Sequence, residues 1–367
     1  SSFLPLERSQ LTSDFLAGLT FAVVNVPQAM ANALLATVNP VFGLYTLMIA
    51  TPVGALFTSS VFMNVSTTGA LSVAVGDALT YFSGEEKVTA MITLVLLIGL
   101  FQLLLGVLKL GTLIRFVSHS VMVGFITGIA INIVLGAIPD VTGYTSPYYS
   151  RILRLADTIL SWRDYDPATF VLGLLTIGLI IGFGYTRMRK FAMILALAVV
   201  TALGVFVTAV LGIDTLELVG EIAEIPRSLP RPMLPSLSMV GIMLVPAVSI
   251  GIIGLVQGAG VGQSYPNPDG KYPNVSRDFT GQGLANMAAS FFHGIPGVGS
   301  MSGTAVSVNA GAQSRCSNIF AGILFAAIVL LFVDIVNIIP MTALCGLLIV
   351  VGFQNIQPDE IATVWQT

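Results

Sequence analysis

Apolar runs alternate with polar connections along the whole chain, and most runs are about as long as a bilayer is thick. Because a hydrocarbon core of about 30 Å needs about 20 apolar residues per helix, such runs predict membrane-spanning helices. Candidate spans lie at residues 14–37, 41–59, 65–81, 88–109, 114–137, 168–186, 191–212, 240–263, 279–293, 300–314, 316–334 and 341–357. The pattern therefore predicts an all-α polytopic membrane protein with twelve spans.

The third, ninth and tenth runs are short or polar for a membrane span. The third holds Val65–Gly76 (VSTTGALSVAVG) and the tenth overlaps Gly299–Gly311 (GSMSGTAVSVNAG), both rich in small residues and hydroxyls. In hydrocarbon, such backbone is tolerated only where protein covers it or where it lines a cavity. We expect short half-helices at spans three and ten, each preceded by a short extended segment and facing inward.

The polar, Glu- and Pro-rich connection at 214–239 predicts a linker between two halves of the chain. The two small-residue segments, Val65–Gly76 and Gly299–Gly311, begin at similar distances from the start of their respective halves. Seven runs precede the linker, and an odd number inverts the second half in the membrane. We therefore predict an inverted repeat of seven spans plus seven, of which this sequence holds about twelve.

Composition and charge agree with a membrane protein. The 367 residues are 55% apolar and 9% charged, against roughly 25% charged in soluble domains. The net charge of -3 and the absence of a basic stripe argue against a nucleic-acid partner. Lys and Arg concentrate after spans four and six, which predicts a multi-pass protein of the inner (plasma) membrane with a cytoplasmic N-terminus.

The two small-residue segments contain candidate anion-binding residues. If they are half-helices that meet at the membrane midplane, their free N–H groups and positive dipole ends suit a small anionic substrate. The candidate residues are Thr67, Thr68 and Gly69 in the first segment and Ser302, Gly303 and Thr304 in the second. The alternative is that small residues merely let helices pack closely.

Amides inside two other spans are further candidates. In the first span, Gln28 and Asn32 lie one turn apart beside Pro27, and Gln257 is the lone amide of GIIGLVQGAGVG in the eighth. We predict that Gln28 reaches the substrate. For all three amides, interhelical hydrogen bonding is the competing interpretation.

Neither the cysteines nor the histidines form a metal or catalytic pattern in the sequence. Cys316 and Cys345 show no CxxC spacing, and His293 has no partners of ligand type nearby in the sequence. A serine protease built on Ser300 or Ser302 with His293 would lack the GxSxG pattern. We expect no metal, no cofactor and no enzymatic activity.

Two long stretches resemble the sulfate permease family, also called SulP or solute carrier family 26, to which prestin and pendrin belong. They are Asp14–Thr46, with its Pro27-Gln28 pair and PVFGLY, and Asp278–Arg315 (DFTGQGLANMAASFFHGIPGVGSMSGTAVSVNAGAQSR). The likeness covers essentially the whole chain.

The resemblance implies a fourteen-span, uracil-permease-like fold with an anion bound between the half-helices of spans three and ten. It divides the chain into a core domain (14–109 and 240–334) and a gate domain (110–213 and 335–367), joined by the linker 214–239. It also implies spans thirteen and fourteen and a C-terminal STAS domain, none of which we expect within these 367 residues.

Three positions depart from the family pattern. Gly303 stands where prestin-like members have Arg, so an anion would be held by dipoles and hydroxyls alone. Gln257 aligns with a Glu of many members, which weakens the case for proton coupling there. Asn32 replaces an aromatic residue of some animal members and makes the pocket more polar.

Together these features predict a secondary anion transporter in the lipid bilayer that works by alternating access of the core against the gate domain. We expect ion-coupled symport of a small carboxylate or dicarboxylate, of bicarbonate or of sulfate. The coupling ion, proton or sodium, and a homodimeric state stay open. The alternatives are a nucleobase permease of the same fold and an anion channel.

Overall fold

The computed structural model describes residues 8–111, 119–148, 151–212, 215–222 and 229–355. The chain divides into two compact units, and each is built from two separate stretches of sequence. Unit 1 comprises Ser1–Val117 and Arg227–Leu331, and unit 2 comprises Ser118–Pro226 and Phe332–Thr367.

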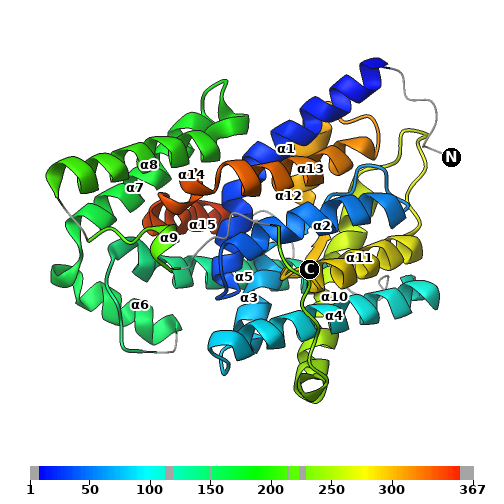
Figure 1. The fold of residues 1–367 in the computed structure, drawn as a ribbon, viewed down its shortest axis with the longest axis horizontal. Helices are drawn as coiled ribbons and strands as arrows, with labels where there is room; N and C mark the ends of the chain where they lie inside the picture. The colour runs from blue at the N-terminus through cyan, green and yellow to red at the C-terminus, as the bar shows by residue number, and fades with distance from the viewer. Residues whose placement is uncertain (1–7, 112–118, 149–150, 213–214, 223–228, 356–367) are drawn as a thin grey trace. The chain divides into compact units, whose positions relative to one another are not determined.

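Unit 1 contains helices on both sides of the linker in sequence (Figure 1). Its elements are α1 (Arg8–Leu35), α2 (Val41–Phe57), β1 (Val65–Thr67), α3 (Gly69–Ala78), α4 (Gly84–Val107), the 3₁₀ turn Leu237–Met239, α10 (Val240–Ser264), α11 (Val275–Ser290), β2 (Gly297–Gly299), α12 (Met301–Asn309) and α13 (Cys316–Leu331). One order of elements therefore occurs twice. It consists of a long helix with an internal proline, a shorter helix, a three-residue strand, a short helix and another helix.

The elements of unit 2 in its described residues are all helices, apart from one isolated antiparallel bridge between Leu218 and Pro340 (Figure 1). Its elements are α5 (His119–Thr142), α6 (Arg151–Leu160), the 3₁₀ turn Trp162–Asp164, α7 (Pro167–Gly184), the 3₁₀ turn Arg189–Phe191, α8 (Ala192–Leu211), α9 (Val219–Ile222), α14 (Val333–Asn337) and α15 (Met341–Asn355). Helix α6 was not predicted, because its stretch reads as part of a polar connection.

The prediction of a helical membrane protein is confirmed. Within the described residues, five helices are long and apolar enough to cross a bilayer: α1, α4, α7, α8 and α10 with its preceding turn. Each of the other predicted runs also contains a helix; α5 has 24 residues, and the others have 9 to 17. How many of these helices cross the membrane stays a prediction.

The third and tenth runs contain the short elements that their composition predicts. Strand β1 leads into the ten-residue helix α3, and strand β2 leads into the nine-residue helix α12. The strands pair antiparallel, with Val65 opposite Gly299 and Thr67 opposite Gly297. Because the two strands bond each other, part of this non-helical backbone is satisfied without water.

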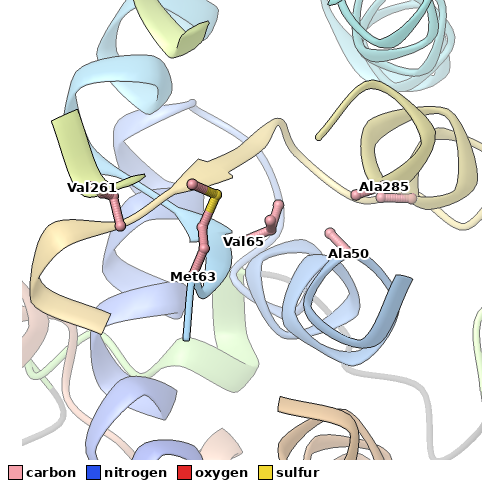
Figure 2. Packing of buried hydrophobic residues seen from close by; sticks show 6 residues of the cluster. Ala50, Met63, Val65, Val261 and Ala285 are labelled. Atoms are coloured by element: carbon pink, nitrogen blue, oxygen red, sulfur yellow. The ribbon is translucent and has the colours of Figure 1, made fainter. Parts of the chain in front are cut away.

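Small apolar side chains surround the strand β1. Met63 and Val65 are fully buried against Ala50 of α2, Val261 of α10 and Ala285 of α11 (Figure 2). Because alanine adds little bulk, three helices approach one short strand closely. Packing of this kind is what associates helices in lipid, where the surroundings are as apolar as the side chains.

Helices α4 and α11 approach through facing glycines. A Cβ added at Gly99 would lie 2.7 Å from the backbone nitrogen of Met287, and one added at Gly283 would lie 2.5 Å from that of Leu103. Real Cβ atoms do not occur at such distances, so the contact requires glycine at both positions. It fixes α11, which in turn holds the strand β2.

Candidate functional site

Unit 1 brings the starts of the two short helices onto one strand ladder. Thr68 is the N-cap of α3 and directly follows β1, while Ser300 is the N-cap of α12 and directly follows β2. Because the strands are antiparallel, the two helix starts lie at opposite ends of the same three-pair ladder. Helices α1 and α10 both contact α3 and α12, so these four elements enclose the region.

The start of α3 is not capped by its own side chain. Thr68 is extended, with φ -131° and ψ 146°, but its hydroxyl donates to Oε1 of Gln257 in α10 (3.1 Å) instead of accepting from the helix. The N–H groups of Gly69, Ala70 and Leu71 have no acceptor among the described residues. Three adjacent donors at a positive helix end therefore lack a partner among the described residues.

The start of α12 differs, because its N-cap side chain is engaged. The Ser300 hydroxyl accepts the N–H of Gly303 (3.1 Å) and lies 3.2 Å from the hydroxyl of Ser302. Gly303 therefore does not offer the free N–H that we expected of it. In the described part of the chain, the N–H groups of Met301 and Ser302 have no partner, and both residues are exposed.

The bare face of Gly303 points into the protein. A Cβ at this position would lie 3.0 Å from a ring carbon of Phe21 and 3.3 Å from both Asn64 Oδ1 and Ser300 Oγ. Phe21 is itself fully buried and packs edge-on against Phe325. Glycine at 303 thus permits close packing of α12 on α1. The packing interpretation therefore applies to this residue, whether or not it also contributes to anion binding.

Thr304 anchors α12 to the chain before β1. It is fully buried, and its hydroxyl accepts the N–H of Asn64 (3.0 Å), while the Asn64 carbonyl accepts the N–H of Ser300 (2.9 Å). The Asn64 amide also donates to Asn318 of α13 (2.9 Å). Thr304 therefore positions the half-helix.

The two site amides predicted in α1 differ, since one is hydrogen-bonded and the other is not. Asn32 is buried, and its amide donates to the hydroxyl of Thr67 in β1 (3.0 Å), so this pair locks α1 to the ladder. Gln28, one turn earlier, is partly buried and makes no hydrogen bond with the described residues. Of the two, Gln28 is the one with free donors and acceptors.

The outer edge of β2 is held by amides of α11 that sequence reasoning missed. Asn286 accepts the N–H of Gly297 (2.7 Å) and donates to its carbonyl (2.8 Å), as a neighbouring strand would. Gln282 accepts the N–H of Gly299 (3.1 Å), and the Asn286 amide is shared with Gln102 of α4 (2.8 Å). Two buried amides at i and i+4 were the available signal.

A buried charged group lies near the end of α2. Arg315, just before α13, donates to the carbonyls of Ala55, Thr58 and Ser59 at 2.6, 2.6 and 3.1 Å. Asp278 of α11 accepts from both the N–H and the hydroxyl of Ser59, each at 2.7 Å. Arg315 therefore caps α2 and is not a free anion attractor.

The predicted site is electrically neutral apart from helix ends. None of the nine predicted residues carries a charge: Gln28, Asn32, Thr67, Thr68, Gly69, Gln257, Ser302, Gly303 and Thr304. The described residues contain no group of three or more His, Cys, Asp or Glu side chains that could hold a metal ion. His293 stacks on Phe42 and forms no hydrogen bond with a serine in the described residues.

Short helices that follow extended backbone within otherwise apolar runs are typical of a class of protein. Broken helices of this kind are found in polytopic membrane transporters. The fold of the described residues is therefore that of a polytopic helical membrane protein with broken helices.

Comparison with known proteins narrows this class to a family. Residues 11–367 match the model of the sulfate permease family. A probable sulfate transporter 4.2 of Arabidopsis thaliana is 31% identical over 92% of this chain, and the bicarbonate transporter BicA of a Picosynechococcus species is 27% identical over 93%. The chain belongs to the sulfate permease family.

Family members are permeases and not enzymes, which agrees with the expectation from the sequence. The chain spans about half the length of the plant relatives that it matches, 50% and 52% for two of them. Among the bacterial relatives it spans 66% of a putative sulfate transporter, YvdB, of Bacillus subtilis.

Solved structures share the fold. The transmembrane domain of a cyanobacterial bicarbonate transporter BicA superposes with a TM-score of 0.84 at 22% identity, over 98% of this chain and 95% of that one. The structure of SLC26A9 superposes with a TM-score of 0.86 at 22% identity, over 98% of this chain and 60% of that one. The match to the family model confirms the sulfate permease resemblance seen in the sequence, and these superpositions show the shared fold.

Proposed function

We propose that this chain forms the anion pathway of a secondary active transporter and that unit 1 carries the binding site. The observation that carries the proposal is the uncapped start of α3, where three consecutive N–H groups have no acceptor among the described residues. A helix start of this kind binds anions through backbone donors and the positive dipole end.

The nine predicted residues take two roles in this proposal. Gly69, Thr68, Gln257, Gln28 and Ser302 bind the anion, since they are partly or fully exposed or have donors to spare. Asn32, Thr67, Gly303 and Thr304 position the two helix starts through buried hydrogen bonds and close packing.

The substrate is a small oxyanion, with sulfate and bicarbonate first because relatives carry these names. A carboxylate or dicarboxylate fits the same neutral donors. Transport proceeds by alternating access, with unit 1 as the core domain and unit 2 as the gate domain, and is coupled to protons or sodium. The repeated order of elements in unit 1 and the antiparallel ladder support an inverted repeat.

We place the protein in the plasma membrane, the inner membrane of a bacterium, with its N-terminus in the cytoplasm. The excess of Lys and Arg after spans four and six supports this orientation. A homodimer is compatible with the proposal but is not needed by it.

Two alternatives predict different behaviour. A nucleobase permease of the same fold would place acidic side chains in spans eight and ten, whereas α10 and α12 contain no Asp or Glu. An anion channel would conduct much faster than a carrier. Single-channel current in planar bilayers would favour the channel over the carrier.

The proposal is tested by uptake into proteoliposomes of labelled sulfate, bicarbonate, chloride, fumarate and uracil, with and without imposed proton or sodium gradients. We expect saturable uptake of at least one anion, stimulated by one gradient, and no uptake of uracil. Uptake of uracil alone would contradict the proposal.

Thr68 and Gln257 give the residue-level test. Thr68→Val removes the hydroxyl that donates to Gln257 but keeps the shape of the side chain. We expect the apparent affinity for the anion to fall about tenfold. One hydrogen bond to a charged ligand, or to a side chain that holds the ligand, is worth about 1.5 kcal/mol. Thr68→Ser retains the hydroxyl and should behave like wild type. Equal uptake kinetics in all three proteins would remove Thr68 from the site.

A further inference from the structure

Helix α6 lies in a loop whose two ends meet in unit 2. The loop leaves α5 at Thr142 and enters α7 at Pro167, and the N–H of Asp166 donates to the Thr142 carbonyl (3.1 Å). The side chain of Asp166 also caps α7 by accepting the N–H of Thr169 (2.8 Å). Because α5 and α7 are apolar helices of span length or close to it, α6 sits at one boundary of the hydrophobic region.

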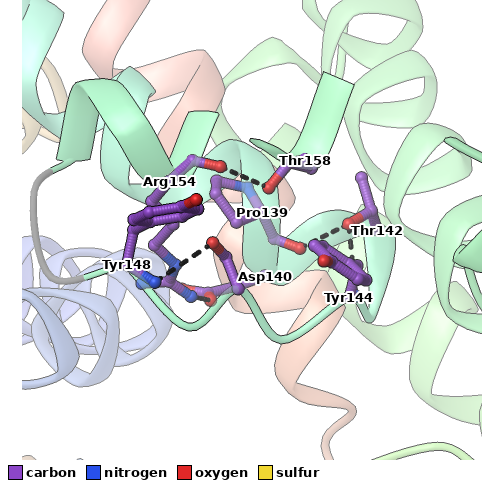
Figure 3. Close-up of polar contacts among 8 residues, drawn as sticks. Pro139, Asp140, Thr142, Tyr144, Tyr148, Arg154 and Thr158 are labelled. Atoms are coloured by element: carbon purple, nitrogen blue, oxygen red, sulfur yellow. Dashed lines mark hydrogen bonds and ion pairs between the residues drawn. The ribbon is translucent and has the colours of Figure 1, made fainter. Parts of the chain in front are cut away.

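The polar face of α6 is turned toward the protein (Figure 3). Arg154 pairs with Asp140 of α5, and Asp157 accepts from Tyr144 (3.1 Å) and Ser146 (2.6 Å). Thr158, on the same face, is fully buried, and its carbonyl accepts the hydroxyl of Tyr165 (2.9 Å). These bonds fix the rotation of the helix about its axis.

The opposite face of α6 is apolar and exposed. The exposed fractions of Ile152, Leu153, Ile159 and Leu160 are 70%, 53%, 60% and 81%. Spacings of one, seven and eight residues place these side chains on one side of the helix. Trp162, two residues after Leu160, is 62% exposed, and the guanidinium carbon of Arg163 lies 5.4 Å from the centre of its ring.

This polarity is the reverse of a water-exposed surface helix, which turns its apolar face inward. We propose that α6 is an interfacial helix, with Ile152, Leu153, Ile159, Leu160 and Trp162 inserted into the boundary between lipid headgroups and acyl chains of one leaflet. The partner of this face is the lipid bilayer.

Three observations favour lipid over another protein. The polar face is anchored to the end of a membrane helix, so the apolar face cannot turn inward. Trp162 is a residue type enriched where membranes meet water, and Arg163 beside it can reach headgroups while its stem lies along the ring. Helix α6 is only ten residues long, about 15 Å, and its apolar face is bordered by charges.

Depth-dependent fluorescence quenching tests the proposal. Trp162 and Trp365 are the two tryptophans of the chain, so Trp365→Phe leaves Trp162 as the single reporter. In proteoliposomes, lipids that carry a quencher near the headgroup should quench Trp162 more strongly than lipids that carry it near the bilayer centre. Absence of quenching, or stronger quenching by the deep label, would overturn the proposal.

Labelling of introduced cysteines provides a second test that also detects a protein partner. In a background with Cys316→Ala and Cys345→Ala, Leu160→Cys should resist a membrane-impermeant thiol reagent in liposomes, applied to both sides, and react in the unfolded protein. Asp164→Cys, at an exposed position two residues after Trp162, should react in both cases. Efficient disulfide formation between copies through Leu160→Cys would overturn the proposal in favour of a dimer contact.

Discussion

Individual hydrogen bonds decide which residues of the site are free to bind a ligand. Hydroxyls and amides of similar type have different roles: the Thr67 hydroxyl is occupied by Asn32, whereas Thr68 reaches toward Gln257. Ser300 occupies the N–H of Gly303, and no side chain among the described residues occupies the corresponding donors of α3. The stronger anion contact is therefore expected at α3.

The tight surroundings of Gly303 give a stability prediction. Gly303→Leu forces Phe21 and Asn64 to move, so we expect a loss of about 1–3 kcal/mol, the usual cost of overpacking, and loss of transport. Thermal unfolding in detergent and uptake measure the two effects. Gly260→Leu is the matched control, because a Cβ there meets nothing within 4 Å, and it should unfold like wild type. A wild-type melting temperature in Gly303→Leu would show that the site has room.

Arg315 gives a second prediction. Arg315→Met leaves three carbonyls near the end of α2 without their donor and Asp278 without the nearby positive charge. Because the side chain is buried, we expect a loss of about 3 kcal/mol or more in the free energy of unfolding. The exposed Arg277→Met on α11 should change it by less than about 0.5 kcal/mol. Similar unfolding curves for the two variants would refute the capping role.

The element that supports the site most directly is α11. Its amides complete the outer edge of β2, and its glycine contact with α4 fixes its position. The strand ladder has only three pairs, which is too few to be stable alone. The side-chain amides of α11 supply the hydrogen bonds that a third strand would make at the edge of β2.

Asn286→Leu tests this role. Both polar groups of Gly297 would lose their partner in a buried place, and we expect a loss of about 2–4 kcal/mol together with faster hydrogen exchange of the β2 amides. Gln263→Leu, an exposed amide of α10, is the control and should alter neither quantity. Unchanged exchange in Asn286→Leu would show that β1 alone holds β2.

The elements also show what a sequence can and cannot predict. The half-helices α3 and α12 were predictable, because small and hydroxyl residues interrupt otherwise apolar runs. Helix α6 was missed because its polar residues look like loop residues until Asp140 and Tyr144 are placed beside them. The use of the Gly303 N–H by Ser300 was likewise invisible, since it depends on the conformation of one N-cap residue.

At the scale of the whole molecule, each unit combines stretches from both halves of the sequence. Apolar periodicity predicted the helical membrane architecture, and two long motifs predicted the family. Hydrogen bonds such as Asp14 with Ser314 and Asn64 with Asn318 join residues more than 250 positions apart, and no local pattern indicates them. These bonds hold together the segments of unit 1 that carry the proposed site.

The central claim is that free backbone donors at the start of α3 hold an anion. Gly69→Pro removes one of these N–H groups and suits the position, because proline is tolerated at the first helical residue and Thr68 before it is already extended. Gly69→Ala adds a side chain but retains the N–H and is the matched control.

Equilibrium binding of sulfate and of bicarbonate to the purified wild-type protein and both variants measures the claim most directly. We predict that Gly69→Ala binds nearly as wild type, and that Gly69→Pro binds at least about tenfold more weakly with an unchanged melting temperature, because a hydrogen bond to a charged ligand is worth about 1.5–3 kcal/mol. Equal affinities of the two variants, or no saturable binding of either anion to the wild-type protein, would contradict the account.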